Sequence, residues 1–288
     1  MKPPLKWIGG KTQLLPELLA RVPKTFGTYY EPFVGGGALF WALAADCQMW
    51  PGHVVLSDIN AELINFYTQL RDFGNPLLEE LKRHSLAHSE KHYYYVRESG
   101  WEGGLESLSP IRRAARFLYI NKAGFNGLWR VNQAGGCNTP WGKHKEFVPD
   151  VENLMACSAA LQGVELVVQP WEAVLGETAI HYAPSQSGDF VYCDPPYVPA
   201  SKTSNFTGYA KGGFGERDQR NLAWAVCCAA RRGVHVLASN SEAARPLYDN
   251  PNRSGLKVEV VQARRAVNCV GSKRGKVGEI LVSNRDAP

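Results

Sequence analysis

Residues 28–44 read TYYEPFVGGGALFWALA, and this stretch indicates the fold of the whole chain. Apolar and aromatic residues at its start predict a short buried strand over Thr28–Phe33. A helical pattern then begins at Ala38 and runs to Ala45. The glycines between the two, residues 35–37, let a ligand approach the backbone closely at the helix N-terminus. A strand, a glycine-rich turn and a helix in this order predict the ligand-binding unit of an α/β sheet.

Strands and helices alternate on both sides of this stretch. The other segments that read as short buried strands are His53–Leu56, Val164–Val168, Phe190–Cys193, Val234–Ala238, Lys257–Ala263 and Glu279–Val282. Helical patterns cover Lys11–Leu19, Ala61–Leu70 and Asp218–Arg231. This alternation predicts an α/β domain with a largely parallel, Rossmann-like sheet. Ligands bind at the carboxyl ends of strands in such sheets, which is where Asp58 and Asp194 fall.

Residues from about 60 to 155 interrupt the alternation of strands and helices. Helical patterns dominate there, over Pro76–Arg83, Lys91–Arg97 and Pro110–Ile120. They are followed by Asn121–Pro149, which is rich in Gly, Asn and aromatic residues. We interpret this region as an inserted, mainly helical subdomain that carries a basic β-hairpin loop. A chain of 288 residues is long enough for one large α/β core and such an insert.

Basic residues are segregated along the chain. The formal net charge is only +5, but Ser107–Lys145 contains no Asp or Glu and seven Lys or Arg. A second acid-free stretch, Val260–Gly278, holds five more. This distribution is expected of a protein that contacts a phosphate backbone, so it favours a nucleic acid as partner. Two solvated faces with counterions are an equally good interpretation of the charge runs alone.

Several classes of protein are disfavoured by the composition. The seven cysteines are odd in number and form no C-x-x-C pair, which argues against a disulfide framework and against a zinc site, and we expect no metal. Met1–Lys6 lacks the apolar core of a signal peptide, and the longest apolar stretch, Leu222–Ala230, is too short to span a bilayer. We therefore expect a protein of the reducing cytoplasm, without a membrane segment and with no evident obligate protein partner.

The glycine loop and Asp58 predict the class of cofactor. Asp58 lies 21 residues after Gly37, at the position that hydrogen-bonds a ribose in nucleotide-type α/β sites. The third glycine of G-x-G-x-x-G is missing, because Phe40 stands there. A nucleoside without a pyrophosphate, such as S-adenosylmethionine, therefore fits better than a dinucleotide. The alternative is a strand–helix turn that binds no ligand.

Gly9, Gly10 and Lys11 resemble part of a phosphate-binding P-loop. A P-loop needs a glycine five positions before Gly10, and Leu5 is there, so we reject that interpretation. Lys11 beside two glycines could instead hold a carboxylate, such as the methionine end of the cofactor. Trp7 could cover the apolar parts of the same molecule.

The tetrad Asp194–Tyr197, Asp-Pro-Pro-Tyr, carries the predicted chemistry. An aromatic amino group is a poor nucleophile because its lone pair is conjugated with the ring. Asp194 could accept one N–H and the Pro195 carbonyl the other, while Pro195 and Pro196 fix the backbone through their locked φ. Tyr197 would stack on the base and hold it out of the duplex. The gain would come from positioning and electrostatics, and the alternative interpretation is a simple turn.

These motifs, taken in order, resemble those of the DNA adenine methyltransferase (Dam) family of bacteria and phages. The resemblance runs nearly end to end through Leu5–Lys11, Glu31–Gly37, Ser57–Asn60, Phe117–Asn121, Phe125–Arg130, Tyr192–Tyr197 and Ser204–Thr207. Their order is similar to that of the α group of amino-methyltransferases. The resemblance implies an S-adenosylmethionine-dependent adenine-N6 methyltransferase of a bacterial or phage-infected cell. Its catalytic domain would span 1–59 and 156–288, and its target-recognition domain 60–155.

The resemblance also implies roles for individual residues. Trp7, Lys11, Asp58 and Asp194 would contact the cofactor, and Asp194 would also hold the target amino group. The cofactor site is expected to include Gly9, Gly10, Glu31, Phe33, Gly35 and Gly37 as well. The expected contacts to double-stranded DNA are Lys6, Lys122, Phe125, Asn126, Leu128, Arg130, Pro140 and His144.

The loop Phe125–Arg130 corresponds to the family's Tyr-Asn-Gly-Leu-x-Arg sequence. Arg130 would then bond O6 and N7 of a guanine together, and family members of this type commonly recognise GATC. A phosphate contact is the alternative for Arg130. Phe125 replaces the usual Tyr and lacks its hydroxyl, and His144 stands where related enzymes often carry Tyr. We interpret His144 as a surface or phosphate-binding residue.

Other interpretations remain open at the level of sequence. The tetrad would serve cytosine N4 or adenine in RNA equally well. A DNA-binding regulator without catalysis is disfavoured by the intact Lys11, Asp58 and Asp194, and a metal-dependent nuclease by the lack of paired carboxylates or a His cluster. Asn205–Gly215 is either a loop that closes over the flipped base or a surface loop. Such an enzyme could belong to a restriction-modification system, act alone or come from a phage.

Overall fold

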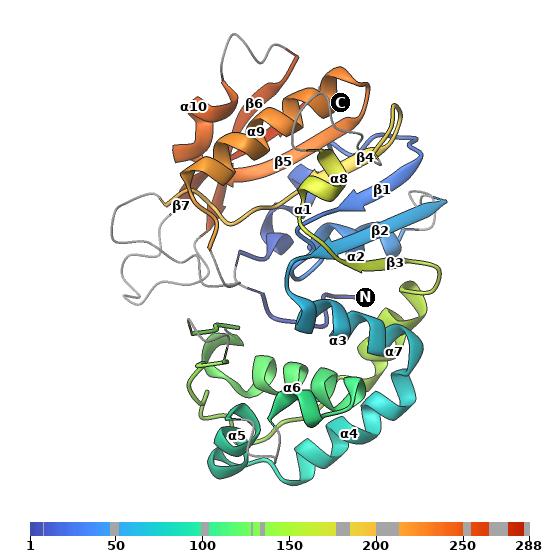
Figure 1. Ribbon diagram of the computed structural model, residues 1–288, viewed down its shortest axis with the longest axis vertical. Helices are drawn as coiled ribbons and strands as arrows, with labels where there is room; N and C mark the ends of the chain where they lie inside the picture. Colours follow the sequence, from blue (N-terminus) through green and yellow to red (C-terminus); the bar gives the residue numbers. More distant parts are fainter. Residues whose placement is uncertain are drawn as a thin grey trace.

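The computed structural model describes residues 1–7, 9–46, 52–98, 104–127, 129–132, 136–176, 185–199, 213–249, 255–264 and 276–284. Within these residues seven strands form one sheet in the order β3-β2-β1-β4-β5-β7-β6 (Figure 1). The strands are β1 (Thr28–Glu31), β2 (His53–Asp58), β3 (Glu165–Val168), β4 (Phe190–Cys193), β5 (His235–Ser241), β6 (Lys257–Arg264) and β7 (Lys276–Ser283). Strands β1 to β5 run parallel, and β7 pairs antiparallel with β5 and β6. The predicted α/β class with a largely parallel sheet is confirmed.

The strand order reverses between β1 and β4. From β1 the sheet extends through β2 to β3, and the chain then returns to place β4 on the other side of β1. The connections of two such neighbouring strands leave in opposite directions, and the carboxyl ends of the strands therefore open a crevice. Glu31 ends β1 and Asp194 follows β4 directly, so the two carboxyl groups belong to the strands that form this crevice.

Helices cover both faces of the sheet. Side chains alternate along each strand, and β4 accordingly contributes Phe190 and Tyr192 to one apolar cluster and Val191 and Cys193 to the other. The first cluster includes residues of α1 (Leu15–Leu19), α2 (Ala38–Ala44) and α3 (Ala61–Asp72), and the second residues of α8 (Glu172–Leu175), α9 (Glu216–Arg231) and α10 (Arg245–Tyr248). Burial on both faces explains why the strands read as short apolar runs.

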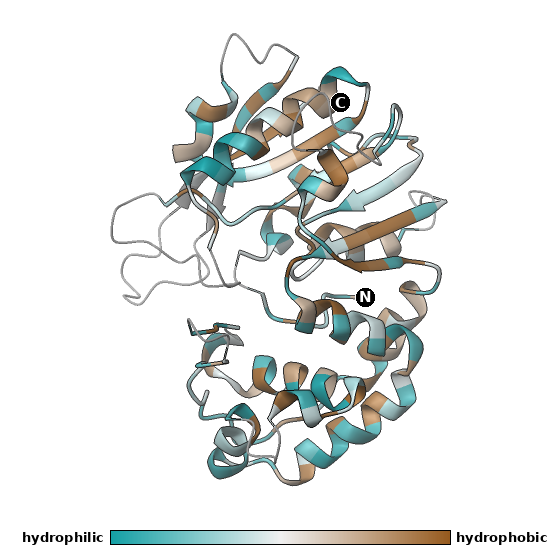
Figure 2. Ribbon diagram, in the orientation of Figure 1, coloured by the Kyte–Doolittle hydropathy of each residue, from teal (hydrophilic) through white to brown (hydrophobic). Residues whose placement is uncertain are grey.

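A helical part lies below the sheet in Figure 1 and is made mostly of the predicted insert. Its helices are α3, α4 (Gly74–Leu86), α5 (Glu90–Arg97), α6 (Pro110–Ala123) and α7 (Val151–Ala160). The side chains of Asn60, Ser89, Ser109 and Asp150 cap the N-termini of α3, α5, α6 and α7 by accepting backbone N–H groups. In Figure 2 the strands β2 and β3 are brown, whereas α4 shows both colours along its length, as an amphipathic helix must.

The helical part shares its core with one face of the sheet. Phe117 on α6 is fully buried, with its ring centroid 6.0 Å from that of Phe66 on α3 and 6.4 Å from that of Trp7. Trp129 contacts the same ring at 4.2 Å. One apolar cluster therefore runs from the strands through α3 and α6 to the start of the basic loop.

Three sequence-based expectations differ from the structure. Strand β1 ends at Glu31, before Phe33, because Pro32 has no N–H for the strand ladder. The helix expected over Lys11–Leu19 is a 3₁₀ turn, η1 (Lys11–Leu14), followed by α1, because Pro16 has no N–H to continue the first turn as an α-helix. The basic loop has two isolated antiparallel bridges, Gly124–Trp141 and Val131–Cys137, and no strand in its described residues.

Three further 3₁₀ turns connect the elements. They are η2 (Leu105–Ser107), η3 (Phe125–Gly127) and η4 (Glu242–Ala244). The turn η3 opens the basic loop directly after α6, and its middle residue, Asn126, has a left-handed φ of 55°. Asn tolerates this conformation better than most residues, so the loop leaves α6 in a sharp turn.

Candidate functional site

Asp194 is at the centre of the candidate site, where β4 ends. Its Oδ1 atom lies 2.8 Å from Lys11 Nζ and accepts a hydrogen bond of 2.8 Å from the Ser239 hydroxyl. The Lys11 side chain is only 5% exposed, and its ammonium also donates to the Gly9 carbonyl. Among the described residues no hydrogen bond reaches Asp194 Oδ2. One oxygen of the carboxylate is therefore held by the protein while the other is free to accept.

Tyr197, the last residue of the tetrad, is fixed at both its ring and its hydroxyl. The hydroxyl donates a hydrogen bond of 2.6 Å to Glu279 Oε2 on β7. Lys11 Nζ lies 4.5 Å from the ring centroid, within the range of a cation–π contact. Burial, together with the charges of Asp194 and Glu279, holds the pKa of Tyr197 well above its usual range. The hydroxyl therefore stays protonated, and one face of the ring is already covered by an ammonium.

Trp7 covers the glycine loop. A Cβ atom placed on Gly35 would lie 2.6 Å from the Trp7 indole nitrogen, and one on Gly36 would lie 2.9 Å from Trp7 Cβ. Gly35 and Gly37 also have positive φ values of 44° and 64°. The loop needs glycine both for its left-handed backbone and for the approach of the indole. The structure thus brings Trp7 to the predicted cofactor motif.

Two carboxyl groups, the buried Glu31 and the partly exposed Asp58, lie at the strand ends next to this loop. Burial raises the pKa of Glu31 to about 8, although the Tyr29 hydroxyl donates to it at 2.8 Å. Burial likewise raises the pKa of Asp58 to about 6. The Asp58 carboxylate accepts N–H groups from Asn60 at 2.9 Å and Gly35 at 3.2 Å, which ties the end of β2 to the glycine loop.

The residues at this end of the sheet fit S-adenosylmethionine. That molecule carries an ammonium, a sulfonium, one carboxylate and two ribose hydroxyls. The carboxylates of Asp58 and Asp194 outnumber the single described ammonium, Lys11, and Glu31 adds a third carboxyl group that burial keeps largely protonated near neutral pH. This set suits a ligand with more positive than negative groups. Phe33, which packs edge-on against Phe214 at 5.8 Å, adds an aromatic ring beside Glu31. Of the predicted glycines, Gly9 and Gly10 lie in the turn before Lys11. Gly35 and Gly37 lie in the loop that Trp7 covers.

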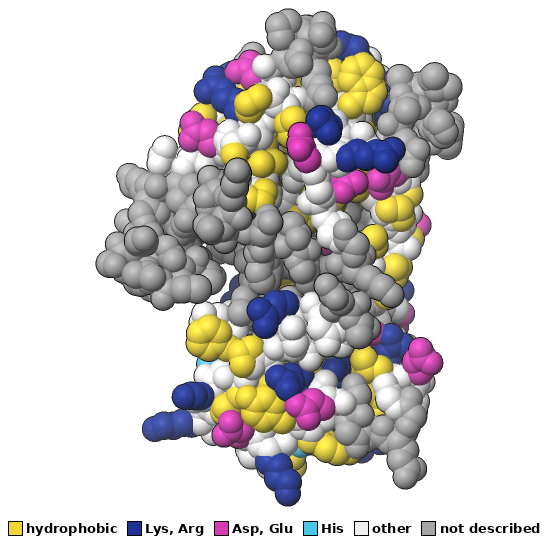
Figure 3. Space-filling view, turned by 60° about the vertical axis from the view of Figure 1, so that its left-hand side comes forward, with side chains coloured by type: hydrophobic (Ala, Val, Ile, Leu, Met, Phe, Trp, Pro, Cys, Tyr) yellow, Lys and Arg dark blue, Asp and Glu magenta, His cyan; other side chains and the backbone are white. Residues whose placement is uncertain are grey.

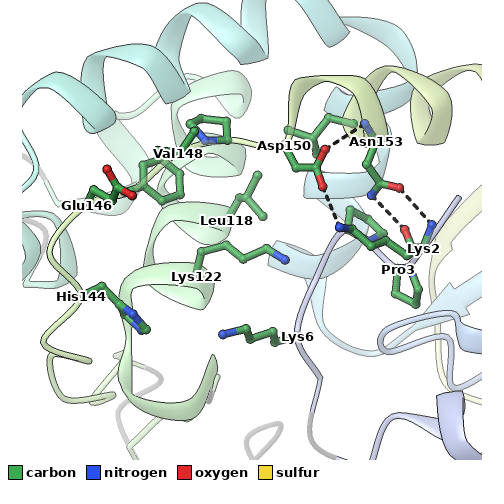
Figure 4. Close-up of a pocket in the computed structure, with 14 residues that line it drawn as sticks. Lys2, Pro3, Lys6, Leu118, Lys122, His144, Glu146, Val148, Asp150 and Asn153 are labelled. Atoms are coloured by element: carbon green, nitrogen blue, oxygen red, sulfur yellow. Dashed lines mark hydrogen bonds and ion pairs between the residues drawn. The ribbon is translucent and has the colours of Figure 1, made fainter.

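Several predicted DNA-contacting residues line a pocket of about 250 Å³ between the start of the chain and α6 (Figure 4). Lys6 and Lys122 extend into the same space, and His144 stands beside them. Burial, helped by the charges of Lys6 and Lys2, lowers the pKa of Lys122 to about 8. Lys2 lies on the other side and is paired with Asp150 at 2.9 Å. Glu146 and Asp150 also line the pocket, but neither Lys6 nor Lys122 forms an ion pair with a described residue, so both ammonium groups could contact a phosphate.

The basic loop presents the rest of the predicted DNA-contacting set. Phe125, Asn126, Arg130, Pro140 and His144 are all exposed, while Leu128 lies outside the described residues. The Phe125 N–H donates to the Pro140 carbonyl at 2.9 Å, and Arg130 Nε donates to Asn138 Oδ1 at 2.8 Å. Figure 3 shows Lys and Arg side chains, interspersed with apolar ones and a few acidic ones, on the helical part.

The charge run Ser107–Lys145 does not lie wholly on one face. Arg116 is buried and donates to the Val96 and Arg97 carbonyls at the end of α5, at 2.9 and 2.8 Å. Arg113 pairs with Glu62 on α3. These two guanidiniums join helices to each other, so they do not add to an exposed basic face. The exposed basic residues of the run are Arg112, Arg130, Lys143 and Lys145. The second run, Val260–Gly278, lies largely outside the described residues.

The sequence prediction missed several residues of the site. Ser239 directly follows a predicted strand. In a parallel sheet the end of a strand beside β4 lies next to Asp194, and this is the signal that could have identified Ser239. Glu279 comes from β7, and nothing in the sequence pairs that strand with Tyr197. Asn121 is fully buried and bonds both the N–H and the C=O of Lys6, at 2.9 and 2.7 Å. Its place at the end of the Phe117–Asn121 motif indicated importance but not this contact.

Two kinds of feature are absent from the described residues. They contain no group of three or more His, Cys, Asp or Glu side chains arranged to hold a metal ion. They also contain no helix that is both long and apolar enough to cross a bilayer.

Comparison with known proteins assigns the family. Residues 7–267 match the model of the D12 class N6 adenine-specific DNA methyltransferases. The chain is 38% identical to the type II methyltransferase M1.LlaDCHI of Lactococcus lactis subsp. cremoris, over 99% of this chain and 95% of the relative. It is 36% identical to a DNA adenine methylase of Vibrio cholerae serotype O1, over 96% and 94%. The DNA adenine methylase of Escherichia coli (strain K12) is 33% identical, over 96% and 93%.

Among solved structures, the rRNA methyltransferase aviRa from Streptomyces viridochromogenes aligns with 95% of this chain and 83% of its own. Its TM-score is 0.33 at 16% identity, so the assignment depends on the family and the sequence relatives. The chain belongs to the D12 class N6 adenine-specific DNA methyltransferases, with S-adenosyl-L-methionine as methyl donor.

Proposed function

We propose that the chain methylates N6 of an adenine flipped out of double-stranded DNA, within the sequence GATC. The geometry of Asp194 carries this proposal. Lys11 and Ser239 hold its Oδ1 atom at 2.8 Å each, while Oδ2 keeps its lone pairs for a substrate. The carboxylate lies at the carboxyl end of β4, beside the switch point where an α/β sheet binds its ligands.

The tetrad would hold the amino group by its two N–H bonds. Asp194 Oδ2 accepts one, and the Pro195 carbonyl accepts the other. The structure supports Pro195 because no donor among the described residues reaches its carbonyl, whereas the Pro196 carbonyl already accepts from Gln219 at 2.5 Å. Two acceptors on the N–H groups draw the nitrogen lone pair out of conjugation, which makes the nitrogen a better nucleophile.

S-adenosylmethionine, when bound, supplies an electrophilic methyl group on a sulfonium. As the N–C bond formed, the methyl–sulfur bond would break and its electron pair would stay on sulfur, leaving a neutral thioether. The Asp194 carboxylate would stabilise the positive charge that develops on N6. The surplus proton leaves N6 along its hydrogen bond to Asp194. Tyr197 stacks on the base with the face that Lys11 does not cover, and its hydrogen bond to Glu279 keeps the ring in place.

We propose that residues 60–155 recognise the target and that 1–59 and 156–288 perform the chemistry. Arg130 would read a guanine, and Lys6 and Lys122 would hold a phosphate in the pocket beside α6. Exposure of Phe125, Asn126, Arg130, Pro140 and His144 on one loop supports the division. GATC itself follows from the resemblance of this loop to the family's recognition loop. The boundary at 155 falls within α7, which packs against α3 as part of the shared core.

Mapping the modified base tests the target. The purified chain is incubated with labelled S-adenosylmethionine and an unmethylated plasmid, and the modified positions are sequenced. We expect N6-methyladenine confined to GATC. N4-methylcytosine, or N6-methyladenine in unrelated sequences, would contradict the proposed target.

The variant Asp194→Ala tests the mechanism. We expect it to lose methylation while its Kd for DNA stays close to that of the unaltered chain, because the carboxylate acts on the amino group and not on the backbone. Asp249→Ala is the matched control, since Asp249 forms an exposed i,i+4 pair with Arg245 on α10. Near-normal turnover in Asp194→Ala would overturn the assigned role.

A further inference from the structure

The backbone of the tetrad can form few hydrogen bonds to the rest of the protein. Pro195 and Pro196 have no N–H groups, so the backbone between Asp194 and Tyr197 has few donors with which to attach itself to the protein. It can be fixed only through its carbonyl groups and through the residues at its ends. Any displacement of this segment would move the Pro195 carbonyl and the Tyr197 ring, which the proposed mechanism needs in fixed positions.

A buried pair of amides attaches this segment to the protein. Gln219, on the first turn of α9, donates from Nε2 to the Pro196 carbonyl at 2.5 Å. Asn240, near the end of β5, donates from Nδ2 to Gln219 Oε1 at 3.0 Å. Asn240 Oδ1 accepts the N–H groups of Val198 at 3.0 Å and Ser241 at 2.8 Å. The two side chains are 3% and 0% exposed.

The direction of every bond in this relay is determined. The N–H groups of Val198 and Ser241 can only donate, so Asn240 must turn its oxygen toward them. Its nitrogen then faces Gln219, which must present its oxygen to Asn240 and its nitrogen to the Pro196 carbonyl. Because the relay is buried, an amide turned the wrong way would leave unsatisfied polar atoms without access to water.

Strand β5 also holds the residues on both sides of this segment. Ser241 donates from its hydroxyl to the Val198 carbonyl at 2.7 Å, and Ser239 donates to Asp194 at 2.8 Å. Three consecutive residues of β5, Ser239 to Ser241, thus bond Asp194 at the start of the tetrad and Val198 directly after it. Within the part of the chain that the structure describes, Gln219 is the one side chain that bonds the middle of the tetrad, at the Pro196 carbonyl.

We propose that Gln219, oriented by Asn240, is a positioning residue for methyl transfer. It fixes the plane of the Pro196–Tyr197 peptide, and through it the direction of the Pro195 carbonyl and the Tyr197 ring. The inference depends on the proposed function of the tetrad. It does not place Gln219 in contact with the substrate, the cofactor or the methyl group.

The variants Gln219→Glu and Gln219→Met test the relay because they differ in whether the side chain can donate a hydrogen bond to the Pro196 carbonyl. Met has a similar length and no donor at any pH. A Glu carboxylate has no donor either, but its protonated form can donate an O–H to the Pro196 carbonyl. Burial favours the protonated form, so protonation is expected at moderately acidic pH. Gln162→Glu is the matched control, because Gln162 donates to backbone carbonyls of Arg71 and Ser158, at 2.8 and 3.1 Å, away from the tetrad.

The readouts are kcat, KM for S-adenosylmethionine and Kd for DNA between pH 6 and pH 8.5, below the unfolding midpoint of each variant. At pH 8.5 we expect kcat of both Gln219 variants to fall about 10- to 100-fold, as for a misplaced reacting group, with KM and Kd little changed. Toward pH 6 the kcat of Gln219→Glu relative to the unaltered chain should recover, while that of Gln219→Met should not. Gln162→Glu should match the unaltered chain throughout.

A pH-independent ratio for Gln219→Glu, or losses that appear equally in KM and Kd, would overturn the positioning role. Asp194→Asn, assayed in parallel, separates this result from a failure of the proposed function. If Asp194→Asn is inactive while both Gln219 variants turn over normally, only the relay is wrong. If Asp194→Asn turns over normally, the role of the tetrad itself is wrong.

Discussion

Glu31 shows how a residue of the site affects the stability of the fold. Its carboxyl group is almost fully buried at the end of β1, and burial raises its pKa from an ordinary value near 4.5 to about 8. The folded chain therefore holds a proton at neutral pH that the unfolded chain has lost. Stability from this group is fully present below about pH 4.5 and is lost as the pH rises toward 8.

We expect Glu31→Gln to remove this loss, because the amide keeps an oxygen for the Tyr29 hydroxyl and cannot ionise. The difference in unfolding free energy between variant and unaltered chain should grow from pH 5 to pH 8 and reach a few kcal/mol, at about 1.4 kcal/mol per unit of pKa shift. Urea unfolding at a series of pH values measures it. A difference that is constant with pH would show that Glu31 ionises normally in the folded chain.

Arg130 gives a prediction about sequence reading. If Arg130 bonds a guanine edge, Arg130→Ala should reduce discrimination at one base pair by about 1–3 kcal/mol and leave other positions unaffected. Lys145→Ala, on the same loop, should weaken binding to all sequences and lower the slope of log Kd against log salt by about 1. Competition binding with single-base variants of the site measures both. Uniform weakening by Arg130→Ala would assign it to a phosphate.

At the residue scale the sequence indicated candidate residues better than it indicated their contacts. Lys11, Asp58 and Asp194 were proposed because their motifs combine an unusual residue type with a strand end or a glycine turn, and their roles stay predictions. Glu279, Gln219 and Asn240 were missed because the tetrad or adjacent residues that they bond are 82, 23 and 42 residues away along the chain. The order of strands in the sheet and the packing of α9 against β5 bring them there, and neither appears in any local pattern.

At the scale of elements, the N-terminal segment and the basic loop are joined at one point. Asn121, at the end of α6, bonds the backbone of Lys6 and also the Gly127 carbonyl, the latter at 3.1 Å. A Cβ atom on Gly127 would lie 2.5 Å from Lys6 Cβ. Gly127 is therefore needed both for its φ of 66° and for the contact with the N-terminal segment.

We expect Gly127→Ala to weaken DNA binding as well as stability, because the new methyl group must displace Lys6 from the pocket. Gly163→Ala is the control, since Gly163 has a similar φ of 76° and nothing within 4 Å of the added atom. Backbone strain alone should cost about 1–2 kcal/mol of unfolding free energy in both variants. Urea unfolding and DNA titration separate the two effects. Equal DNA affinities in the two variants would refute the contact argument.

The strands were predicted closely because each is a short apolar run that ends in a polar residue. The expected Phe190–Cys193 has the observed bounds, and His53–Leu56 falls two residues short of β2. The hairpin was less predictable. The bridges Gly124–Trp141 and Val131–Cys137 join residues with little alternation of apolar and polar side chains, so the described residues around them form no regular strand.

At the scale of the whole molecule, the sheet and the helical part share one apolar cluster. Phe117 is its junction, with Trp7 on the cofactor side, Phe66 on α3 and Trp129 at the loop. Two parts that share a core lose the same contacts when either one unfolds. The helical part is therefore expected to unfold together with the sheet.

We expect Phe117→Ala to lower the unfolding free energy by about 3–5 kcal/mol, as for a large aromatic removed from a core. The far-UV circular dichroism and tryptophan fluorescence transitions should move together in urea. Leu86→Ala is the control, because Leu86 is 90% exposed on α4 and its removal should change little. Two separate transitions, with only one displaced by Phe117→Ala, would show that the parts unfold independently.

The hydrogen bonds between Asn121 and the Lys6 backbone have a thermodynamic consequence for the binding of cofactor and DNA. Five residues after Lys6, Lys11 holds Asp194 beside the glycine loop. Cofactor at the loop and DNA at the pocket would thus restrain the same short segment, and the ligand that binds second would find it already ordered. Linkage then requires each ligand to tighten the other by the same factor. We expect the Kd for DNA without cofactor, divided by the Kd for DNA with cofactor, to exceed one. The Kd for cofactor without DNA, divided by that with DNA, should give the same ratio.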